Sequence, residues 1–310
     1  MPRVPRRLLD AVAYIYPTTE AANDGTPGGS TGFLISVSFE SPQFPNLAHL
    51  YLVTNAHCVT PEPSVAVRFN TKSGGTEVVA INRDQWIFHP EGDDIAAVAI
   101  DLDQAIYRLS DVPAEILMTE EQRNADFGVG DECFVIGRNV GLEGKRTNTP
   151  TARFGAVSMM APEPVYQPLR ARAQDSIVVE AKSLGGYSGA PAFVHQSPPI
   201  TEPVRKGMER WPVVVQSYSQ SGFAMLGVTW GHINGPAVIE GPAHDLPKSE
   251  RALLVNSGMM LVVPAWKIRE LLDVDILASA RRSDEQECEK LANESSAVLD
   301  SGEVPRTQEP

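Results

Sequence analysis

Cysteine is scarce in this sequence of 310 residues, which has only Cys58, Cys133 and Cys288. An odd number of cysteines without a CxxC pair or a His/Cys cluster argues against a disulfide framework and against a structural zinc site. Basic residues are also in deficit, with 26 Lys and Arg against 39 Asp and Glu and a net charge of −13. Because phosphate binding needs concentrated positive charge, this balance argues against nucleic acid as a main partner.

Long hydrophobic runs are absent as well. No stretch approaches the roughly 18 uninterrupted apolar residues that a membrane helix needs. The N-terminal segment is basic, but Asp10 breaks the apolar run that follows and no small-residue cleavage site comes after it, so we read no secretory signal. Together with the reduced-looking cysteines, these absences predict a cytoplasmic protein without a membrane partner.

Short apolar or alternating runs recur along the chain and are separated by spacers rich in glycine and proline. Their lengths, β-branched residues and turn-rich spacers predict the strands of a β-sandwich or barrel. A first series of strands is expected at 10–17, 32–39, 49–56, 64–69, 77–82 and 94–101. A second series is expected at 131–138, 153–160, 176–181, 190–194, 211–217, 223–231 and 258–264.

The strand pattern is interrupted by a charged, mixed stretch at 102–130, which indicates two domains. We predict an N-terminal domain over 1–115, a linker over 116–130 and a C-terminal domain over 131–280. Apolar residues at helical spacing predict one helix over 265–273, packed against the second domain. The acidic segment 281–310 has no aromatic residue and predicts a disordered tail or a weak solvated helix.

The segment 184–191, with the sequence LGGYSGAP, is the most informative for chemistry. Glycines on both sides of Ser188 let the backbone turn sharply, so that the hydroxyl is presented while nearby N–H groups point at an oxyanion. A tight turn between two strands explains the same octapeptide equally well.

A serine hydroxyl needs an adjacent base to react, normally a histidine that is oriented by a carboxylate. His57 directly follows the strand-like run 51–56, and Asp93 and Asp94 lead into an apolar run where an acid needs a hydrogen-bond donor. A satisfied structural histidine and a strand-initiating turn are the alternative explanations. No special chemistry surrounds the other histidines, which are His49, His89, His195, His232 and His244.

Taken together, these segments resemble the motifs of the chymotrypsin-like (trypsin-like) serine peptidases, and especially the protease domain of the bacterial HtrA-type branch. The order His, Asp, Ser is the order found in that family. The resemblance covers roughly residues 10 to 275. The matching segments are 54–59 for the histidine, 94–96 for the aspartate, 186–191 for the serine, 228–231 for the substrate-pairing strand and 258–271 for the closing strand and helix.

The resemblance implies an all-β fold of two six-stranded antiparallel Greek-key barrels followed by a C-terminal helix, with the site between the barrels. It implies Ser188 as the nucleophile, His57 as the general base and then acid, and Asp94 as the group that fixes the imidazole tautomer. Asp94 is preferred over its neighbour Asp93 because Ile-Ala follows the aspartate directly in the family; Asp93 is the fallback. Neither a metal nor an organic cofactor is implied.

The resemblance also implies an oxyanion hole formed by the N–H groups of Gly186 and Ser188, and a hydrogen bond from Thr229 to the aspartate. The residues implied in substrate binding are Lys182, Thr229, Trp230, Gly231 and Gly258. No acid stands at the expected base of the specificity pocket, so an Arg or Lys preference is disfavoured. A small or apolar residue is favoured, and Lys182 or His232 offers an acidic residue as the alternative.

Several departures from the family matter. Tyr187 stands where the digestive enzymes carry aspartate, and no Ile-Val-Gly-Gly start is present, so activation by a cleaved N-terminus is not available. Thr31 lies on the strand that would carry the disulfide partner of Cys58, which is missing. No PDZ-like module follows residue 280. The segment 195–222 is longer than the family needs between these strands, and it could be a lid, a partner site or a surface loop.

The first functional hypothesis is a serine endopeptidase that hydrolyses polypeptides through an acyl-enzyme intermediate. Because an unregulated cytoplasmic protease would be harmful, we expect narrow specificity or gating by a regulatory protein partner. The alternative is a protease-like binding or regulatory module whose site is intact in sequence but latent or inactive in geometry. A third, weaker hypothesis is an esterase, since the same triad cleaves esters.

Overall fold

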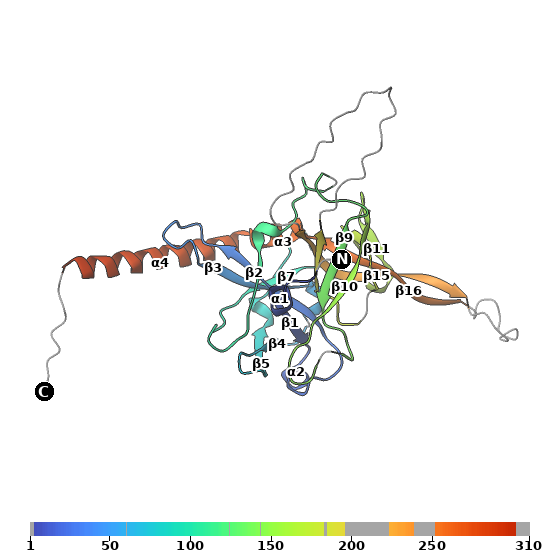
Figure 1. Ribbon diagram of the computed structural model, residues 1–310, viewed down its shortest axis with the longest axis horizontal. Helices are drawn as coiled ribbons and strands as arrows, with labels where there is room; N and C mark the ends of the chain where they lie inside the picture. The colour runs from blue at the N-terminus through green and yellow to red at the C-terminus, as the bar shows by residue number, and fades with distance from the viewer. Residues whose placement is uncertain are drawn as a thin grey trace, which may run out of the picture.

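The computed structural model describes residues 3–59, 61–123, 125–142, 144–182, 185–195, 223–238 and 252–301. Within these ranges the chain forms an N-terminal β-sheet domain, a C-terminal β-barrel and two helices that follow the barrel (Figure 1). The strand expected at 211–217, nearly all of the long segment 195–222 and His244 lie outside the described residues.

The N-terminal domain is one eight-stranded sheet, preceded by the short helix α1 (Arg6–Asp10) and with α2 (Thr19–Asp24) between its first two strands. Its main path has the order β5-β4-β1-β2-β3-β7-β6, and β8 pairs with β2 in parallel. The strands are β1 (Val12–Tyr16), β2 (Ser30–Ser38), β3 (Ala48–Thr54), β4 (Ser64–Asn70), β5 (Thr76–Asn82), β6 (Ile87–Phe88), β7 (Ala96–Ala99) and β8 (Val112–Pro113).

The predicted all-β fold with two β-domains is confirmed, and this first domain is a half-barrel, because its sheet does not pair the two edge strands. The 3₁₀ turn η2 (Arg83–Gln85) separates β5 from β6 and is held by a capping box at Asn82. Strand β6 has only two residues and pairs with β7, so it leaves β5 without a partner on its outer side. The domain is therefore a half-barrel that is open between β5 and β6.

The C-terminal domain is a closed six-stranded barrel with the order β10-β13-β16-β15-β14-β9, which confirms the predicted barrel. Strands β15 and β16 continue past the barrel as a long antiparallel hairpin (Figure 1). A separate two-stranded hairpin, which the sequence did not predict, is formed by β11 (Val165–Gln167), the 3₁₀ turn η4 (Pro168–Arg170) and β12 (Arg172–Gln174). The barrel strands are β9 (Glu132–Gly137), β10 (Thr151–Met160), β13 (Ile177–Glu180), β14 (Pro191–His195), β15 (Phe223–Val238) and β16 (Ala252–Pro264).

The two domains share one hydrophobic core. Buried side chains of the N-terminal sheet, such as Phe33 and Val53, belong to the same cluster as Val135 and Leu226 of the barrel. A second, smaller cluster lies within the N-terminal sheet alone. Because interiors are packed at crystal-like density, this continuous core holds the two domains at a fixed relative position.

Two helices end the described chain. Helix α3 (Ala265–Leu272) confirms the helix predicted over 265–273. Helix α4 (Asp275–Ser301) covers much of the acidic segment 281–310, for which the sequence left a disordered tail and a solvated helix as alternatives. It is held by distant partners: Glu285 lies 3.0 Å from His49 on β3, and Arg281 donates to the hydroxyl of Tyr51 on the same strand at 3.3 Å. Helix α4 then extends beyond the N-terminal domain (Figure 1). Among the described helices, none is long and apolar enough to span a bilayer.

Candidate active site

A histidine and a carboxylate meet at the edge of the N-terminal sheet. His57 lies in the 3₁₀ turn η1 (Ala56–Cys58) that follows β3, and Asp94 lies just before β7. The His57 Nδ1 atom is 2.6 Å from Asp94 Oδ2, and the His57 backbone N–H donates to Asp94 Oδ1 at 3.0 Å. Strands β3 and β7 pair with each other, so the sheet itself brings the two residues together.

Asp94 is held by hydrogen bonds of its backbone as well as of its side chain. The side-chain amide of Asn55 donates to its carbonyl at 2.8 Å, and its N–H donates to Oε1 of Gln174 at 2.9 Å. Gln174 belongs to β12 and also donates to Asp93 at 2.7 Å. The Asp94 side chain is 3% exposed, whereas the His57 side chain is 24% exposed. A buried carboxylate thus orients an imidazole that still reaches solvent.

The two groups shift each other's protonation. Burial lowers the pKa of His57, but the neighbouring Cys58 and the hydrogen bond and charge of Asp94 raise it, and the net result is a pKa of about 9. Burial raises the pKa of Asp94, whereas the hydrogen bonds and charge of His57 lower it more, so the net shift is downward. The pair is therefore an ion pair at neutral pH.

Ser188 lies in the connection between β13 and β14, which hydrogen bonds from the N-terminal sheet hold in place. The Thr31 N–H on β2 donates to the Ser188 carbonyl at 2.8 Å, and the Thr31 hydroxyl donates to the Gly186 carbonyl at 2.7 Å. Gly189 has a φ of +82°, and a Cβ there would lie 2.1 Å from the Thr31 carbonyl oxygen. Both the conformation and the space require glycine at that position.

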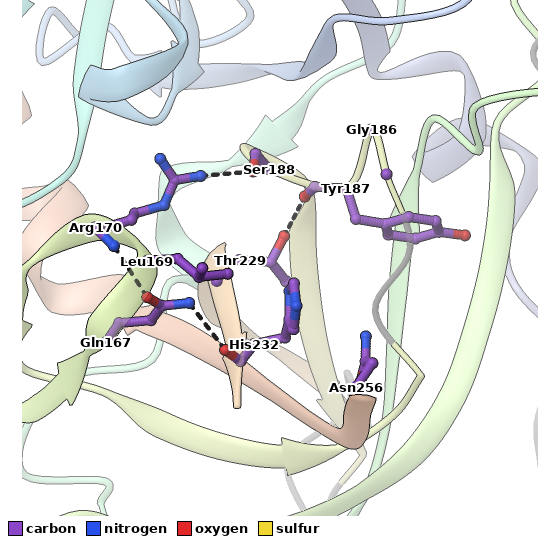
Figure 2. Close-up of a pocket in the computed structure, with 11 residues that line it drawn as sticks. Gln167, Leu169, Arg170, Gly186, Tyr187, Ser188, Thr229, His232 and Asn256 are labelled. Atoms are coloured by element: carbon purple, nitrogen blue, oxygen red, sulfur yellow. Dashed lines mark hydrogen bonds between the residues drawn. The ribbon is translucent and has the colours of Figure 1, made fainter. Parts of the chain in front are cut away.

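Ser188 lies between two cavities. One, of about 300 Å³, is lined by both Ser188 and His57, together with Cys58 and residues of β1 and the start of β2. The other, of about 460 Å³, shares only Ser188 with that lining. Its walls, shown in Figure 2, are formed by Gln167, Leu169, Arg170, Gly185, Gly186, Tyr187, Ser188, Thr229, Gly231, His232 and Asn256.

An arginine that the sequence did not indicate reaches the serine. Within the described residues, the Ser188 hydroxyl has one hydrogen-bond partner, the guanidinium of Arg170 at 3.5 Å (Figure 2). It therefore makes no hydrogen bond to His57. The Arg170 Nε–H also donates to the carbonyl of Trp230 at 3.1 Å. The hairpin β11–β12 thus touches both halves of the site, through Arg170 at the serine and through Gln174 at the aspartate.

The structure places some of the expected substrate-binding residues at the larger cavity and others outside it. Thr229 and Gly231 line it, as does His232. The Trp230 indole is fully buried and donates to Ser176, Lys182 is exposed outside the lining, and Gly258 lies outside it too. Sequence reasoning missed Gln167, Leu169, Arg170 and Asn256, for which no motif gives a signal.

The expected hydrogen bond from Thr229 to the aspartate is not made. The buried Thr229 hydroxyl donates instead to the carbonyls of Tyr187 and Ala190, on the serine turn. A hydroxyl has a single proton, which here is shared between these two carbonyls, so Thr229 supports the serine turn rather than the aspartate.

A group of side chains with the chemistry to hold a metal ion lies beside Asp94 and outside the lining of both cavities. His89, Asp93 and Glu270 bring their ligand atoms within 4.8 Å of one another. The Lys267 ammonium lies 3.5 Å from the Asp93 carboxylate and 3.0 Å from that of Glu270, so a cation already neutralises both. This group links α3 to the loop before Asp94. Asp93, the alternative to Asp94 in the sequence analysis, contacts Lys267 and His89 of this group.

The fold and the site define a class of protein: a β-sheet domain and an antiparallel barrel, joined by one core, with histidine and carboxylate from the first and serine from the second. The model of the trypsin-like peptidase domain family matches residues 30–197, which is just over half of the chain. The chain therefore belongs to the family of trypsin-like peptidase domains.

Solved structures that resemble this chain include two protease-like proteins or domains. The apo form of the MamO protease domain from Magnetospirillum magneticum has a TM-score of 0.47 and 14% identity, over 85% of this chain and 96% of that chain. Human heparin binding protein has a TM-score of 0.45 and 12% identity, over 88% of this chain and 93% of that chain. No curated protein sequence matches the chain.

Proposed function

We propose that the protein is a serine endopeptidase that cleaves polypeptides through an acyl-enzyme intermediate. The observation that supports this most directly is that His57, held by Asp94 at 2.6 Å, lines the same cavity as Ser188. A base that is oriented by a buried carboxylate beside a serine hydroxyl is the arrangement that activates this weak nucleophile.

In the proposed acylation, the Ser188 oxygen attacks the peptide carbonyl carbon while Nε2 of His57 takes the hydroxyl proton. The negative charge that develops on the carbonyl oxygen needs preorganised donors. Within the described residues, the N–H groups of Gly186 and Ser188 donate to no protein acceptor, so both are free to serve. Gly186 and Ser188 are both partly exposed, so water can accept these two hydrogen bonds until a substrate carbonyl replaces it.

The tetrahedral intermediate then collapses. The C–N bond breaks, and His57 gives its proton to the leaving amine, which departs through the cavity that His57 lines. Water next attacks the acyl-enzyme ester with His57 again as the base, which releases the acid product and restores the Ser188 hydroxyl. Asp94 keeps its hydrogen bond to Nδ1 throughout and stabilises the imidazolium.

A second candidate function is a protease-like binding or regulatory module with a latent site. The observation that favours it is the Ser188 hydroxyl, whose hydrogen bond goes to Arg170 rather than to His57. In this case a regulatory partner or a substrate would have to turn the serine toward the histidine before reaction.

Labelling by a fluorophosphonate probe, followed by intact-mass measurement, distinguishes the two. We expect stoichiometric phosphonylation of the wild-type protein and none of Ser188→Ala. Ser158→Ala is the matched control, because Ser158 lies half-buried on β10 of the same barrel and lines neither cavity. A folded wild-type protein that stays unlabelled would refute the endopeptidase and leave the latent module.

A further inference from the structure

The larger cavity beside Ser188 has a positive charge and no negative one. Arg170 contributes a permanent cation, and the imidazole of His232 and the amides of Gln167 and Asn256 also line the cavity (Figure 2). No Asp or Glu belongs to the described lining. We infer that this cavity receives the acidic side chain of a Glu or Asp residue on the N-terminal side of the scissile bond, with Arg170 as the residue that determines this specificity. The inference rests on the proposed function, since it names the substrate class of the same site.

The chemistry decides which side of the substrate enters this cavity. The leaving amine must depart where His57 can protonate it, and His57 lines the smaller cavity. The acyl carbon stays on Ser188, with its oxygen at the N–H groups of Gly186 and Ser188. Both of these residues also line the larger cavity. The side chain of the acyl residue therefore enters the larger cavity, where Arg170 is.

Arg170 is held in place before any substrate binds. Its backbone N–H donates to Oε1 of Gln167 at 3.1 Å, and Nε2 of Gln167 donates to the carbonyl of His232 at 3.0 Å. Its Nε–H donates to the carbonyl of Trp230 at 3.1 Å. These three hydrogen bonds fix the hairpin turn and the root of the guanidinium against β15, so that little side-chain freedom is lost when a ligand binds.

The Arg170 guanidinium has N–H donors that no described residue engages. It has five N–H bonds, and contacts with the described residues engage two of them: the bond to Trp230 and the 3.5 Å bond to Ser188. A planar fork of free N–H groups matches the two oxygens of a carboxylate. An incoming carboxylate would compete with Ser188 for the same Nη2 group. Binding of an acidic residue would thereby release the serine hydroxyl to turn toward His57.

Glutamate and glutamine have nearly the same shape but differ in charge, and this difference isolates the role of Arg170. We would measure kcat/KM for acetyl-Ala-Ala-Pro-Glu 4-nitroanilide and for its Gln counterpart. The wild-type protein should prefer Glu by roughly tenfold or more, as expected for a charge-assisted hydrogen bond. The preference should shrink at about 1 M salt, where charges are screened within a few ångströms.

Two variants test the assignment. Arg170→Gln should bring the Glu/Gln ratio to about one, whatever happens to the absolute rate. Arg172→Gln removes the same charge two residues further along the same hairpin, at a half-buried position outside the cavity lining, and should keep the wild-type ratio. A wild-type ratio at or below one, or a ratio that survives Arg170→Gln, would overturn the inference.

Binding separates this inference from the proposed function. Fluorescein-labelled Ala-Ala-Pro-Glu and Ala-Ala-Pro-Gln peptides would be titrated against the Ser188→Ala protein, with and without Arg170→Gln, by fluorescence polarisation. Tighter binding of the Glu peptide that depends on Arg170, in a protein whose wild type cleaves neither substrate and takes no fluorophosphonate, would support the acidic pocket and refute the peptidase. Cleavage without a preference for Glu, or no binding of either peptide, would refute the acidic pocket.

Discussion

The protonation state of His57 sets the pH at which Ser188 can react, and we predict a rise at unusually alkaline pH. The ordinary pKa of histidine is 6.5; burial lowers it here, but Cys58 and Asp94 raise it to about 9. Only the neutral imidazole can accept the serine proton. At pH 7, two units below this pKa, about 1% of the molecules are in that form. The labelling rate at pH 7 should thus be about 1% of its plateau and should rise about tenfold per pH unit.

The assay is the second-order rate of fluorophosphonate labelling between about pH 6 and pH 10.5, corrected for hydrolysis of the probe. Cys58→Ala should move the midpoint downward, because Cys58 is one of the groups that raise the pKa of His57. The ring resonances of His57 followed by NMR give the same midpoint without any reaction. A midpoint near 6.5, or a rate that does not change over this range, would refute the argument from the His57–Asp94 pair.

The same shift affects stability in the opposite direction. A folded-state pKa above the unfolded value contributes stability that is fully present below about pH 6.5 and is lost as the pH rises through about 9. A difference of two to three pKa units corresponds to a contribution on the order of 3 kcal/mol. The melting temperature should therefore fall between pH 6 and pH 10, and less so in His57→Gln. Alkaline pH should therefore activate Ser188 and, at the same time, lower the stability of the fold.

Three further predictions concern the groups that position the site and α4. Asp94→Asn should reduce the labelling rate by roughly 10³- to 10⁴-fold, because the amide favours the wrong tautomer of the imidazole. Thr31→Val removes the hydrogen bond to the Gly186 carbonyl, which costs about 1–3 kcal/mol, and labelling should slow roughly tenfold or more, whereas Thr31→Ser should retain it. Glu285→Ala removes the closer of the two α4 carboxylates that pair with His49, Glu285 at 3.0 Å and Asp284 at 3.9 Å, and should lower the melting temperature by about 2–6 °C, as followed by circular dichroism.

The sequence was sufficient for the parts of the fold that depend on local pattern. Alternating and β-branched runs predicted the longer strands of both domains and the helix at 265–273, but not the short strands β6 and β8 or the hairpin β11–β12. The choice of Asp94 over Asp93 agrees with the geometry, in which Asp94 contacts His57 while Asp93 contacts Lys267. The open edge of the N-terminal sheet could not be predicted, because it depends on how short β6 is and on the turn before it.

The parts that the sequence did not predict depend on distant contacts. Arg170 reaches the site because its Nε–H donates to Trp230, 60 residues away in the chain, and no spacing indicates such a pair. For the segment that forms most of α4, the acidic composition left a disordered tail and a solvated helix as alternatives. The partners of Glu285 and Arg281 on β3 lie more than 200 residues earlier, and these long-range contacts supply the stability that composition alone could not show.

The two candidate functions differ in the partner of the Ser188 hydroxyl. The backbone around Ser188 is fixed by Thr31, and the imidazole of His57 is fixed by Asp94. Rotation about χ1 of Ser188 moves the hydroxyl from one staggered position to another. The bond that holds the hydroxyl at Arg170 is long, at 3.5 Å, and is therefore weak. A ligand carboxylate that binds the Arg170 guanidinium would replace this bond and free the Ser188 hydroxyl to turn toward His57. In this proposal Arg170 both selects the substrate and releases the nucleophile.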